Sequence, residues 1–422
     1  MSSTLAPALP GLPDRRSLQR SLARADRRRK LRAIALTAPL LLYLVLTFLV
    51  PIGVLLERAV ENPEVANALP RTAVALQGWN REGSPSAEAF AALARDLASL
   101  PERADAGALA RRLNSEVPGA RSLVMTTYRA LPLPQITPAS SAADIRAALL
   151  AVDPRWSETP YWQAIAKNAS RWTPDYLLTS VDLRRDAKGA VERVAPEQRV
   201  FARILARTFE ISLVVTLWCL LLAYPLAYWL TTLSARKANV LMILVLVPFW
   251  TSILVRVAAW IVLLQSEGLV NHALIGLHLI GQPLALLFNR TGVVIAMVHI
   301  LLPFMILPLY SVMRGVPPTY LRAAVSLGSA PLAAFFRVYV PQTYPGIGAG
   351  ALLVFILSIG YYVTPALLGG PEDQMLSYYI AQYTNVNVNW GMACALGALL
   401  LAATLVLYAV YRRVTKAELS LG

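Results

Sequence analysis

The sequence predicts an all-α polytopic membrane protein, with six transmembrane helices and a large, mainly helical insert between the first and second of them. Hydrophobic residues make up 56% of the 422 positions and charged residues only 15%, a balance too apolar for a soluble chain of this length. Six apolar runs exceed the ~18 residues that indicate a spanning helix. Lys and Arg also gather in alternate connections between these runs.

The six runs are bounded by charged residues or by Pro and Gly. At ~1.5 Å rise per residue, each is long enough to cross a hydrocarbon core of ~30 Å. Interior prolines are compatible with this interpretation, because neighbouring helices satisfy the freed carbonyls inside a bilayer. The predicted spans are residues 33–56, 208–233, 240–265, 291–313, 347–368 and 391–411, of which the last five form a core over residues 208–413.

The distribution of basic residues predicts the orientation, because short cytoplasmic loops carry an excess of Lys and Arg. Outside the insert the chain has 19 Lys and Arg, and 17 of them fall on one side of the predicted spans. We therefore expect both termini to be cytoplasmic, with residues 1–32 as a basic leading segment and residues 414–422 as a tail. This asymmetry accounts for most of the net charge of +15 without nucleic acid.

The insert, residues 57–207, has a soluble composition and is long enough to fold as a domain, which we expect to face the periplasm. Helical patterns run over residues 86–100, 104–116, 142–152 and 161–178. Its larger aromatic residues are expected to form the domain core, with a docking surface as the alternative. They are Trp79, Trp156, Tyr161, Trp162, Trp172 and Tyr176.

No cofactor or catalytic centre is predicted in this chain. The insert contains neither His nor Cys, which excludes Ser/His and Cys/His chemistry there. Cys219 and Cys394 lie inside apolar runs, and the three histidines, His272, His278 and His299, are scattered without metal-ligand spacing. No GxxxxGK[ST] phosphate loop occurs, so nucleotide must bind elsewhere.

The predicted cytoplasmic loop at residues 314–341 has the pattern of two short helices. Pro317 and Pro318 suit a helix start, and Gly328 with Pro331 permits a sharp break before a second helix. Apolar residues then lie on one face of each helix. We expect residues 319–336, called the knob below, to fit a groove on a moving cytosolic partner.

The loop resembles the coupling-loop signature of importer-type ABC permeases, a Glu-Ala-Ala triplet followed four residues later by Gly and later by Leu-Pro. Here the triplet reads Arg322-Ala323-Ala324, Gly328 keeps its place, and Val340-Pro341 replaces Leu-Pro. The resemblance implies contact with the ATPase by Tyr320, Leu321, Arg322, Ala323, Ala324, Gly328 and Ser329. It extends to the stretches 248–251, 267–271, 302–305 and 362–370, which together look like the spermidine/putrescine branch.

This resemblance implies the fold of a type I ABC importer permease that works by alternating access. The implied partners are a periplasmic substrate-binding protein, a cytosolic ABC ATPase dimer that binds ATP and Mg, and a second permease subunit, expected to be a different chain. The implied solute is a polyamine such as spermidine or putrescine. Other small organic cations, opine-like compounds and organophosphonates stay open.

Candidates for the translocation path or its gate are Trp250, Arg256, Glu267, Tyr361 and Tyr362. Arg256 lies deep in an apolar run and either faces the path, pairs with a partner subunit or snorkels. Tyr361 and Tyr362 are the best gate candidates, because Gly360 and Pro365 allow a non-ideal helix between them. Interfacial aromatic belts are the alternative role for such residues. Further candidates for contact with a cation are Glu210, Glu372, Asp373 and Tyr383.

Hydropathy alone also fits a secondary transporter or channel. A span, domain, span order suits a membrane sensor, but the predicted cytoplasmic segments are too short for an output domain. Too few polar residues converge near the spans to propose a membrane enzyme. Co-purification of an ATPase would separate an ABC permease from a secondary transporter.

Overall fold

The computed structural model describes residues 34–132, 140–186 and 189–419, and the side chains of residues 34–413 within those ranges. The chain divides into two compact units, Met1–Glu57 and Arg58–Gly422. The described part of the first unit is helical. A π-helical turn, η1 (Val45–Leu49), precedes α2 (Val50–Arg58). Pro51 has no N–H to give to the carbonyl four residues before it, and a π turn is a usual way to accommodate such a gap.

The insert in the second unit is mainly helical, as predicted. Several of its helices begin where a proline at the first position or a capping side chain satisfies the chain end. Ser141, for example, forms a capping box with Asp144 at the start of α8. The elements are α3 (Pro63–Ala68), α4 (Pro70–Ala75), α5 (Ala87–Ala98), α6 (Arg103–Asn114), α7 (Ala120–Ala130), α8 (Ala142–Val152), η2 (Pro154–Ser157), α9 (Thr159–Lys167), α10 (Asp175–Ser180), and the antiparallel strands β1 (Leu183–Arg185) and β2 (Val191–Arg193).

The prediction of one helix over residues 161–178 was wrong, since α9 and α10 are separate. The Asn168 side chain donates to the Ala164 carbonyl and ends α9. Beyond it the backbone is extended: Asn62 N–H donates to the Arg171 carbonyl and Thr173 N–H to the Val60 carbonyl. These long-range pairings replace the helical hydrogen bonds, and local periodicity does not report them. Helix α7 and the small β-hairpin were also missed.

The six large aromatic residues of the insert do not all lie in one core. Trp156 and Trp162 are fully buried, and their ring centroids lie 5.5 Å apart. Tyr161 and Trp79 pack in the same cluster, so the core prediction is confirmed for these four residues. Trp172 is exposed, and Tyr176 belongs to a different buried cluster together with residues of α20 and α21.

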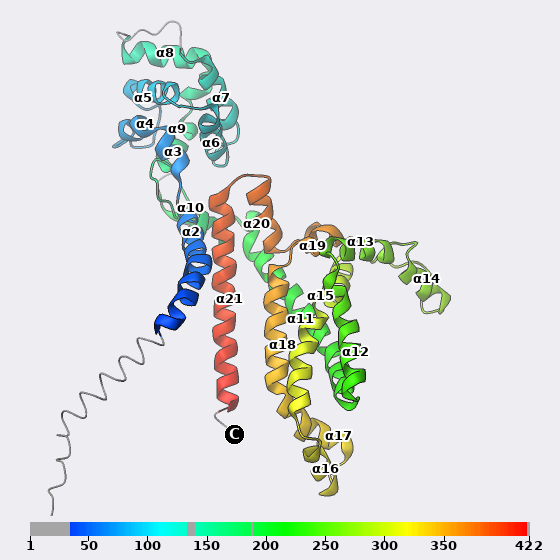
Figure 1. The fold of residues 1–422 in the computed structure, drawn as a ribbon. Coiled ribbons are helices and arrows are strands. Elements are labelled where there is room, and N and C mark those ends of the chain that lie inside the picture. The colour runs from blue at the N-terminus through cyan, green and yellow to red at the C-terminus, as the bar shows by residue number, and fades with distance from the viewer. Residues whose placement is uncertain (1–33, 133–139, 187–188, 420–422) are drawn as a thin grey trace, which may run out of the picture. The chain divides into compact units, whose positions relative to one another are not determined.

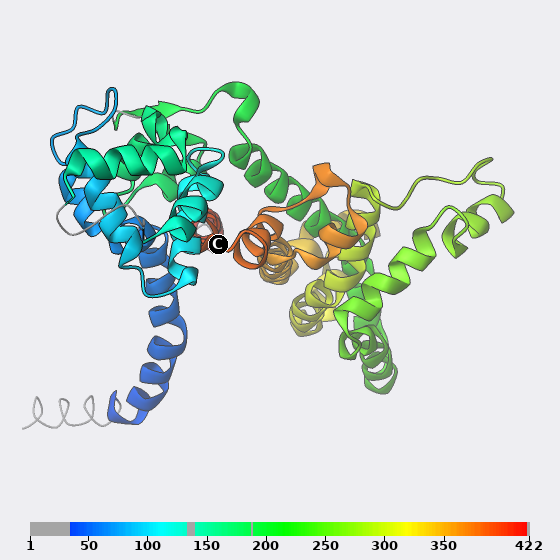
Figure 2. The ribbon, with the colours of Figure 1, turned by 90° about the horizontal axis from the view of Figure 1, so that it is seen from above.

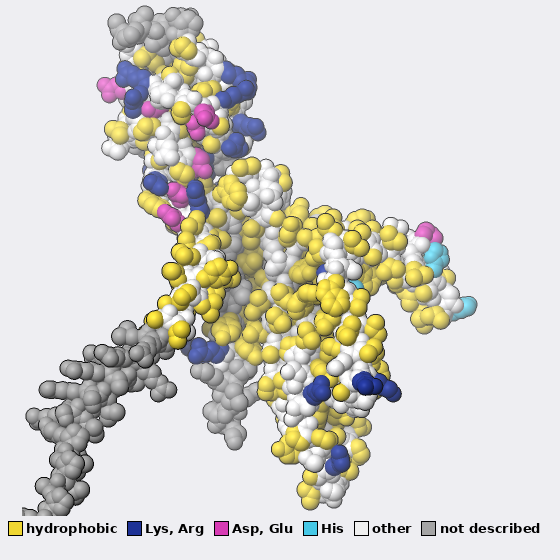
Figure 3. All heavy atoms as spheres, in the orientation of Figure 1, with side chains coloured by type: hydrophobic (Ala, Val, Ile, Leu, Met, Phe, Trp, Pro, Cys, Tyr) yellow, Lys and Arg dark blue, Asp and Glu magenta, His cyan; other side chains and the backbone are white. Residues whose placement is uncertain are grey.

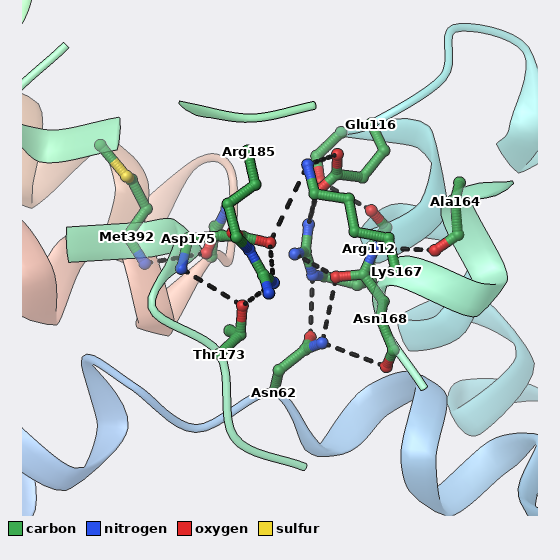
Figure 4. Close-up of polar contacts among 12 residues, drawn as sticks. Asn62, Arg112, Glu116, Ala164, Lys167, Asn168, Thr173, Asp175, Arg185 and Met392 are labelled. Atoms are coloured by element: carbon green, nitrogen blue, oxygen red, sulfur yellow. Dashed lines mark hydrogen bonds and ion pairs between the residues drawn. The ribbon is translucent and has the colours of Figure 1, made fainter. Parts of the chain in front are cut away.

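The buried guanidinium of Arg112 lies at the centre of a network of polar contacts in the insert (Figure 4). Arg112 donates from Nε to Asn62 Oδ1 at 2.8 Å and pairs through Nη1 with Glu116 Oε1 at 3.1 Å. Its Nη2 donates to Asn168 Oδ1, and its Cζ lies 5.0 Å from the centre of the Tyr176 ring. One side chain from α6 thus holds together the segment before α3, the end of α9 and the start of α10.

Asp175 continues this cluster toward the hairpin. It accepts from Arg185 Nε, with 2.5 Å between the atoms, and lies 3.9 Å from Lys167 Nζ. Burial raises the pKa of Asp175, but the hydrogen bonds from Arg185 and the charge of Lys167 outweigh it, so that the pKa lies below its usual value. The carboxylate therefore stays ionised and fixes the hairpin to α10.

Helices α11, α15 and α18 pack against one another as the centre of the apolar core (Figures 1 and 2). Small residues allow the approach: a Cβ at Gly350 would lie 2.8 Å from Met305 Sδ on α15. The elements are α11 (Phe201–Thr232), α12 (Ala235–Leu246), η4 (Val247–Trp250), α13 (Ile253–Leu264), α14 (Leu269–Gly276), α15 (Arg290–Gly315), α16 (Pro318–Ser326), α17 (Pro331–Ala334), η5 (Phe335–Tyr339), α18 (Val340–Gly360), α19 (Val363–Leu368), η6 (Pro371–Asp373), α20 (Leu376–Asn385) and α21 (Trp390–Leu419).

Within the described residues, six helices are long and apolar enough to cross a membrane. They are Ile34–Arg58, Phe201–Thr232, Ile253–Gly276, Arg290–Gly315, Pro331–Gly360 and Trp390–Arg413. Three coincide with predicted spans within two residues at each end, and Phe201–Thr232 agrees with its predicted span at the C-terminal end only. The third differs, because Pro248 starts a 3-10 turn and Thr251 and Ser252 are extended, so residues 240–265 are not one helix.

The fifth span is also displaced toward the N-terminus. A π turn, η5, joins α17 to α18, so the predicted second short helix of the knob is the beginning of the span Pro331–Gly360. The helix then ends at Gly360, and residues 361–368 are not part of it. Compositional runs locate an apolar stretch but do not show where a helix starts outside it.

Helix α11 begins at Phe201, seven residues before the predicted span. The carboxylate of Asp182 accepts hydrogen bonds from the backbone N–H groups of Val200, Phe201 and Ala202, at 3.0, 3.0 and 2.8 Å. These are donors that a helix start leaves without partners. Asp182 follows α10, so a residue of the insert sets the start of α11.

Candidate functional site

The knob begins with α16 and turns sharply at Gly328, as predicted. Gly328 has a φ of +93°, in the left-handed region. Its N–H donates to the Val325 carbonyl, and the Ser329 N–H donates to the Ala324 carbonyl. This pair of bonds is the Schellman motif, which satisfies the last carbonyls of a helix and fixes the direction of the chain beyond it. The turn is therefore rigid.

Apolar side chains of the knob are exposed. The exposed fractions reach 88% for Leu327, 74% for Leu332 and 65% for Phe336. Figure 3 shows hydrophobic side chains over the end of the molecule formed by α16 and α17. Contiguous apolar surface of this kind indicates an interaction site. Of the predicted coupling residues, Tyr320, Arg322, Ala323 and Gly328 are exposed, and Leu321, Ala324 and Ser329 are half-buried.

Arg322, in place of the family glutamate, has no ion pair with any residue that the structure describes. Its side chain is exposed on the outer part of α16. An exposed guanidinium there is available to a partner.

An aromatic cluster joins the knob to the helical core. Phe335 stacks on Tyr339, with 5.4 Å between the ring centroids, and both rings meet Tyr228 of α11 edge-on at 5.2 Å. The Tyr224 hydroxyl lies 3.0 Å from Thr343 Oγ1. Displacement of the knob therefore acts on α11 as well as on α18. This cluster was not predicted, although Tyr224 and Tyr228 are four residues apart on one helix face.

The candidate path residues do not all converge. Arg256 on α13 interacts electrostatically with Tyr361, which caps the end of α18, and its Nε is buried without a hydrogen-bond partner among the described residues. Tyr362, the residue after Tyr361, is 44% exposed. Trp250 is 76% exposed at the break before α13, and Glu267 lies in an exposed turn 3.7 Å from His272 Nε2. Only Arg256 and Tyr361 are thus brought together.

Three of the acidic candidates, Glu210, Glu372 and Asp373, are bound by two arginines. Arg290 at the start of α15 pairs with Glu210 Oε1 at 2.7 Å and with Asp373 Oδ1 at 3.3 Å. Arg207 donates to the Glu372 carbonyl at 2.6 Å. These contacts fasten the segment around η6 to α11 and α15. These contacts could not be predicted, since nothing local in the sequence reveals partners 80 to 165 residues away.

Tyr383, the remaining cation candidate, is half-buried on α20, where its ring lies 6.5 Å from that of Phe201. Burial raises the pKa of Tyr383. Its surroundings are those of a packing residue. Among the described residues, no group of three or more His, Cys, Asp and Glu could hold a metal ion.

Comparison of the sequence with known proteins shows its family. The family described as "Binding-protein-dependent transport system inner membrane component" matches residues 215–418. The spermidine/putrescine transport system permease protein PotB of Escherichia coli (strain K12) is 34% identical over 218 residues, which cover 51% of this chain and 79% of that protein. The chain belongs to the family of binding-protein-dependent transport system inner membrane components. It is the inner-membrane permease subunit of an ABC importer and is similar to the spermidine/putrescine branch.

The chain is also similar to the following proteins. PotB of Haemophilus influenzae (strain ATCC 51907 / DSM 11121 / KW20 / Rd) is 35% identical over 219 residues, 51% of this chain and 76% of that protein. A crystal structure of a bacterial alginate ABC transporter with an alginate pentasaccharide-bound periplasmic protein aligns with 18% identity and a TM-score of 0.44, over 52% of this chain and 81% of that chain. The family match begins inside α11, so the insert lies outside it.

The prediction that Tyr361 and Tyr362 form a gate can be tested in the permease. The two residues cap α18 and α19 in non-helical conformations, as the Gly and Pro positions predicted. Replacing both by alanine should reduce solute uptake about tenfold or uncouple ATP hydrolysis from uptake, because two rings that can separate the halves of the path would be lost. The measurement is uptake and ATPase rate in proteoliposomes of the assembled importer.

The control for the gate is a pair of aromatic residues that the structure leaves at the helix surface, Trp218 and Trp229, each 49% exposed on α11. Alanine at both should change uptake less than twofold. Unchanged uptake and coupling in the Tyr361→Ala/Tyr362→Ala variant would remove these residues from the path.

Proposed function

We propose that this permease subunit moves a polyamine such as spermidine or putrescine from a periplasmic substrate-binding protein to the cytoplasm. A cytosolic ABC ATPase dimer, which binds ATP and Mg, supplies the energy, and this chain performs no catalysis. A second permease subunit, a different chain, completes the pathway. The termini and the knob face the cytoplasm, and the insert faces the periplasm.

The observation that carries the coupling part of this proposal is the knob. It exposes Leu327 and Leu332, it turns rigidly at Gly328, and its root stacks on α11 through Phe335. A stiff apolar element that starts outside the spans at α16 and continues into the span Pro331–Gly360, with a packed contact to α11, is suited to transmit a partner's movement to the membrane. The basic residues near the knob, Arg314 and Arg337, support its cytoplasmic position.

A polyamine is supported by the relatives, whose permeases serve spermidine and putrescine transport. Arg290 pairs with both Glu210 and Asp373, so these carboxylates serve structure before they serve a cation. The exposed Tyr362 ring near the interrupted helix supports recognition through an aromatic face.

The need for a second permease is supported by the third span. Its apolar side chains are largely uncovered in this chain, with exposed fractions of 58% for Leu254, 62% for Val255 and 63% for Val262. A helix that packs so little within its own chain gains partners from lipid or from another subunit.

Uptake of radiolabelled spermidine tests the solute. Cells that express this chain with its partner subunits should accumulate spermidine, and unlabelled putrescine should compete with it. An organophosphonate should not compete. Competition by the phosphonate, without competition by putrescine, would contradict the polyamine assignment and leave the importer assignment in place.

A further inference from the structure

The insert carries a groove lined by four arginines that its own fold does not use. The groove runs between α6 and α7 and has a volume of about 850 Å³. Figure 3 shows Lys and Arg side chains gathered along the edge of the insert over these two helices. Its charged lining is Arg103 and Arg111 on α6, and Arg121 and Arg129 on α7, and no carboxylate contributes to it.

These arginines are free to bind a partner. All four are exposed, and none forms an ion pair with a residue in the described part of the chain. Nearby arginines differ in having ion pairs. Arg112, the residue after Arg111, is buried and paired with Glu116, and Arg155 is paired with Asp153 at 2.7 Å.

The groove is held in a fixed shape by the insert core. Leu109 and Leu113 of α6 and Leu123 and Val124 of α7 are buried in that core. Arg155 closes the turn between the helices by donating to the Gly119 carbonyl at 3.2 Å and to Ser122 Oγ at 3.1 Å. A preorganised charged surface loses less entropy on binding than a mobile one.

The spacing of the charges favours a broad acidic surface over a single phosphate. Arg103 and Arg111 are eight residues apart on α6, and Arg121 and Arg129 are eight apart on α7, which corresponds to ~12 Å along each helix. Four guanidinium groups so distributed present positive charge along the whole groove. They match carboxylates spread over a protein face, each of which an arginine binds through two parallel hydrogen bonds.

We infer that this groove docks the acidic face of the soluble protein that delivers the solute to the permease. The inference rests on the proposed function: a carrier that holds a polycation needs carboxylates around its binding site, and such a face complements the groove. The arginines repel a polyamine, so the groove receives the carrier and not its cargo. Complementary charge speeds and orients the encounter, and salt weakens it.

A carboxylate peptide tests the groove without the ATPase or the carrier. The full chain is placed in nanodiscs of neutral phosphatidylcholine, and binding of fluorescein-labelled decaglutamate is followed by anisotropy. The Arg103→Glu/Arg121→Glu variant should weaken binding more than about tenfold, since two attractive contacts become repulsive. Both substitutions fall in the first turn of a helix, where glutamate is favourable, so the fold is retained.

The matched control is Arg71→Glu/Arg95→Glu, which makes the same charge change at exposed positions of α4 and α5. It should change peptide binding less than twofold. Equal weakening by both double variants, no binding by the unaltered chain, or binding of inorganic polyphosphate without decaglutamate would each overturn the inference.

Uptake separates this inference from the proposed function. The groove variant should need a higher concentration of carrier for half-maximal uptake, while uptake at saturating carrier is retained. An unchanged carrier dependence would remove the groove as the docking surface and leave the importer function standing. Absence of ATP-dependent uptake by the unaltered complex would overturn the proposed function, and with it the role of the carrier.

Discussion

Replacing Gly328 by valine should reduce solute uptake by about tenfold or more while the six spans remain folded. The φ of +93° is one that a β-branched residue adopts only with strain, which costs ~1–3 kcal/mol. That strain is enough to shift the turn between two states by a factor of roughly 5 to 150. The knob would then lose its fixed orientation. Uptake and stimulated ATP hydrolysis in proteoliposomes measure the effect.

Two controls separate the backbone conformation from size. Gly328→Asn should retain most of the uptake, because asparagine tolerates the left-handed region. Gly315→Val places the same side chain at a glycine that also has open space around it but lacks a positive φ, and it should retain more uptake than Gly328→Val. If the Gly328→Val variant took up solute as fast as the unaltered chain, the rigid turn would have no part in coupling.

Replacing Arg112 by methionine should lower the free energy of unfolding of the insert by ~3–5 kcal/mol. The substitution removes one of the two ion-pair partners of Glu116, which keeps Lys167, and leaves the buried Asn62 Oδ1 without its donor. Asn168 Oδ1 keeps only the hydrogen bond from Asn62 Nδ2. The substitution also removes the guanidinium from the Tyr176 ring. Hydrogen exchange of peptides from α6 and α9, measured on the full chain in nanodiscs, reports the change.

The neighbouring residue provides the control for this change. Arg111→Met alters the same side-chain type one position along, but Arg111 is exposed, so the free energy of unfolding should change by less than ~0.5 kcal/mol. Equal loss of protection in both variants would show that the buried network around Arg112 does not hold the insert together.

Much of the fold could be predicted because spanning helices are specified by long local runs. The run near residues 291–313 coincides with α15 within two residues at each end, and the runs near residues 208–233 and 391–411 match one end of α11 and of α21 within one residue. The third and fifth spans could not be placed in this way, because Pro248 and the π turn at Phe335–Tyr339 change the helix path without changing hydropathy. The break at Asn168 depends on contacts with residues about a hundred positions away.

The site was predicted where one residue specifies its own geometry. Gly328 is such a residue, since its position after a helical pattern requires a left-handed turn. The gathering of Arg103, Arg111, Arg121 and Arg129 along one groove could not be seen, because α7 was not predicted and its face was therefore unknown. Likewise, Arg290 is a lone charge in the sequence but joins two distant carboxylates in the fold.

The most direct measurement asks whether the knob couples this chain to an ATPase. The full chain is purified in mild detergent from membranes that contain its partner subunits, and the co-purifying protein and its ATP hydrolysis are measured for the unaltered chain and for Leu327→Asp. We expect an ABC ATPase to co-purify with the unaltered chain and to be lost with Leu327→Asp, because a charge would replace an apolar side chain that is 88% exposed. Solute transport by the purified chain alone, driven by an ion gradient without any ATPase, would contradict this expectation.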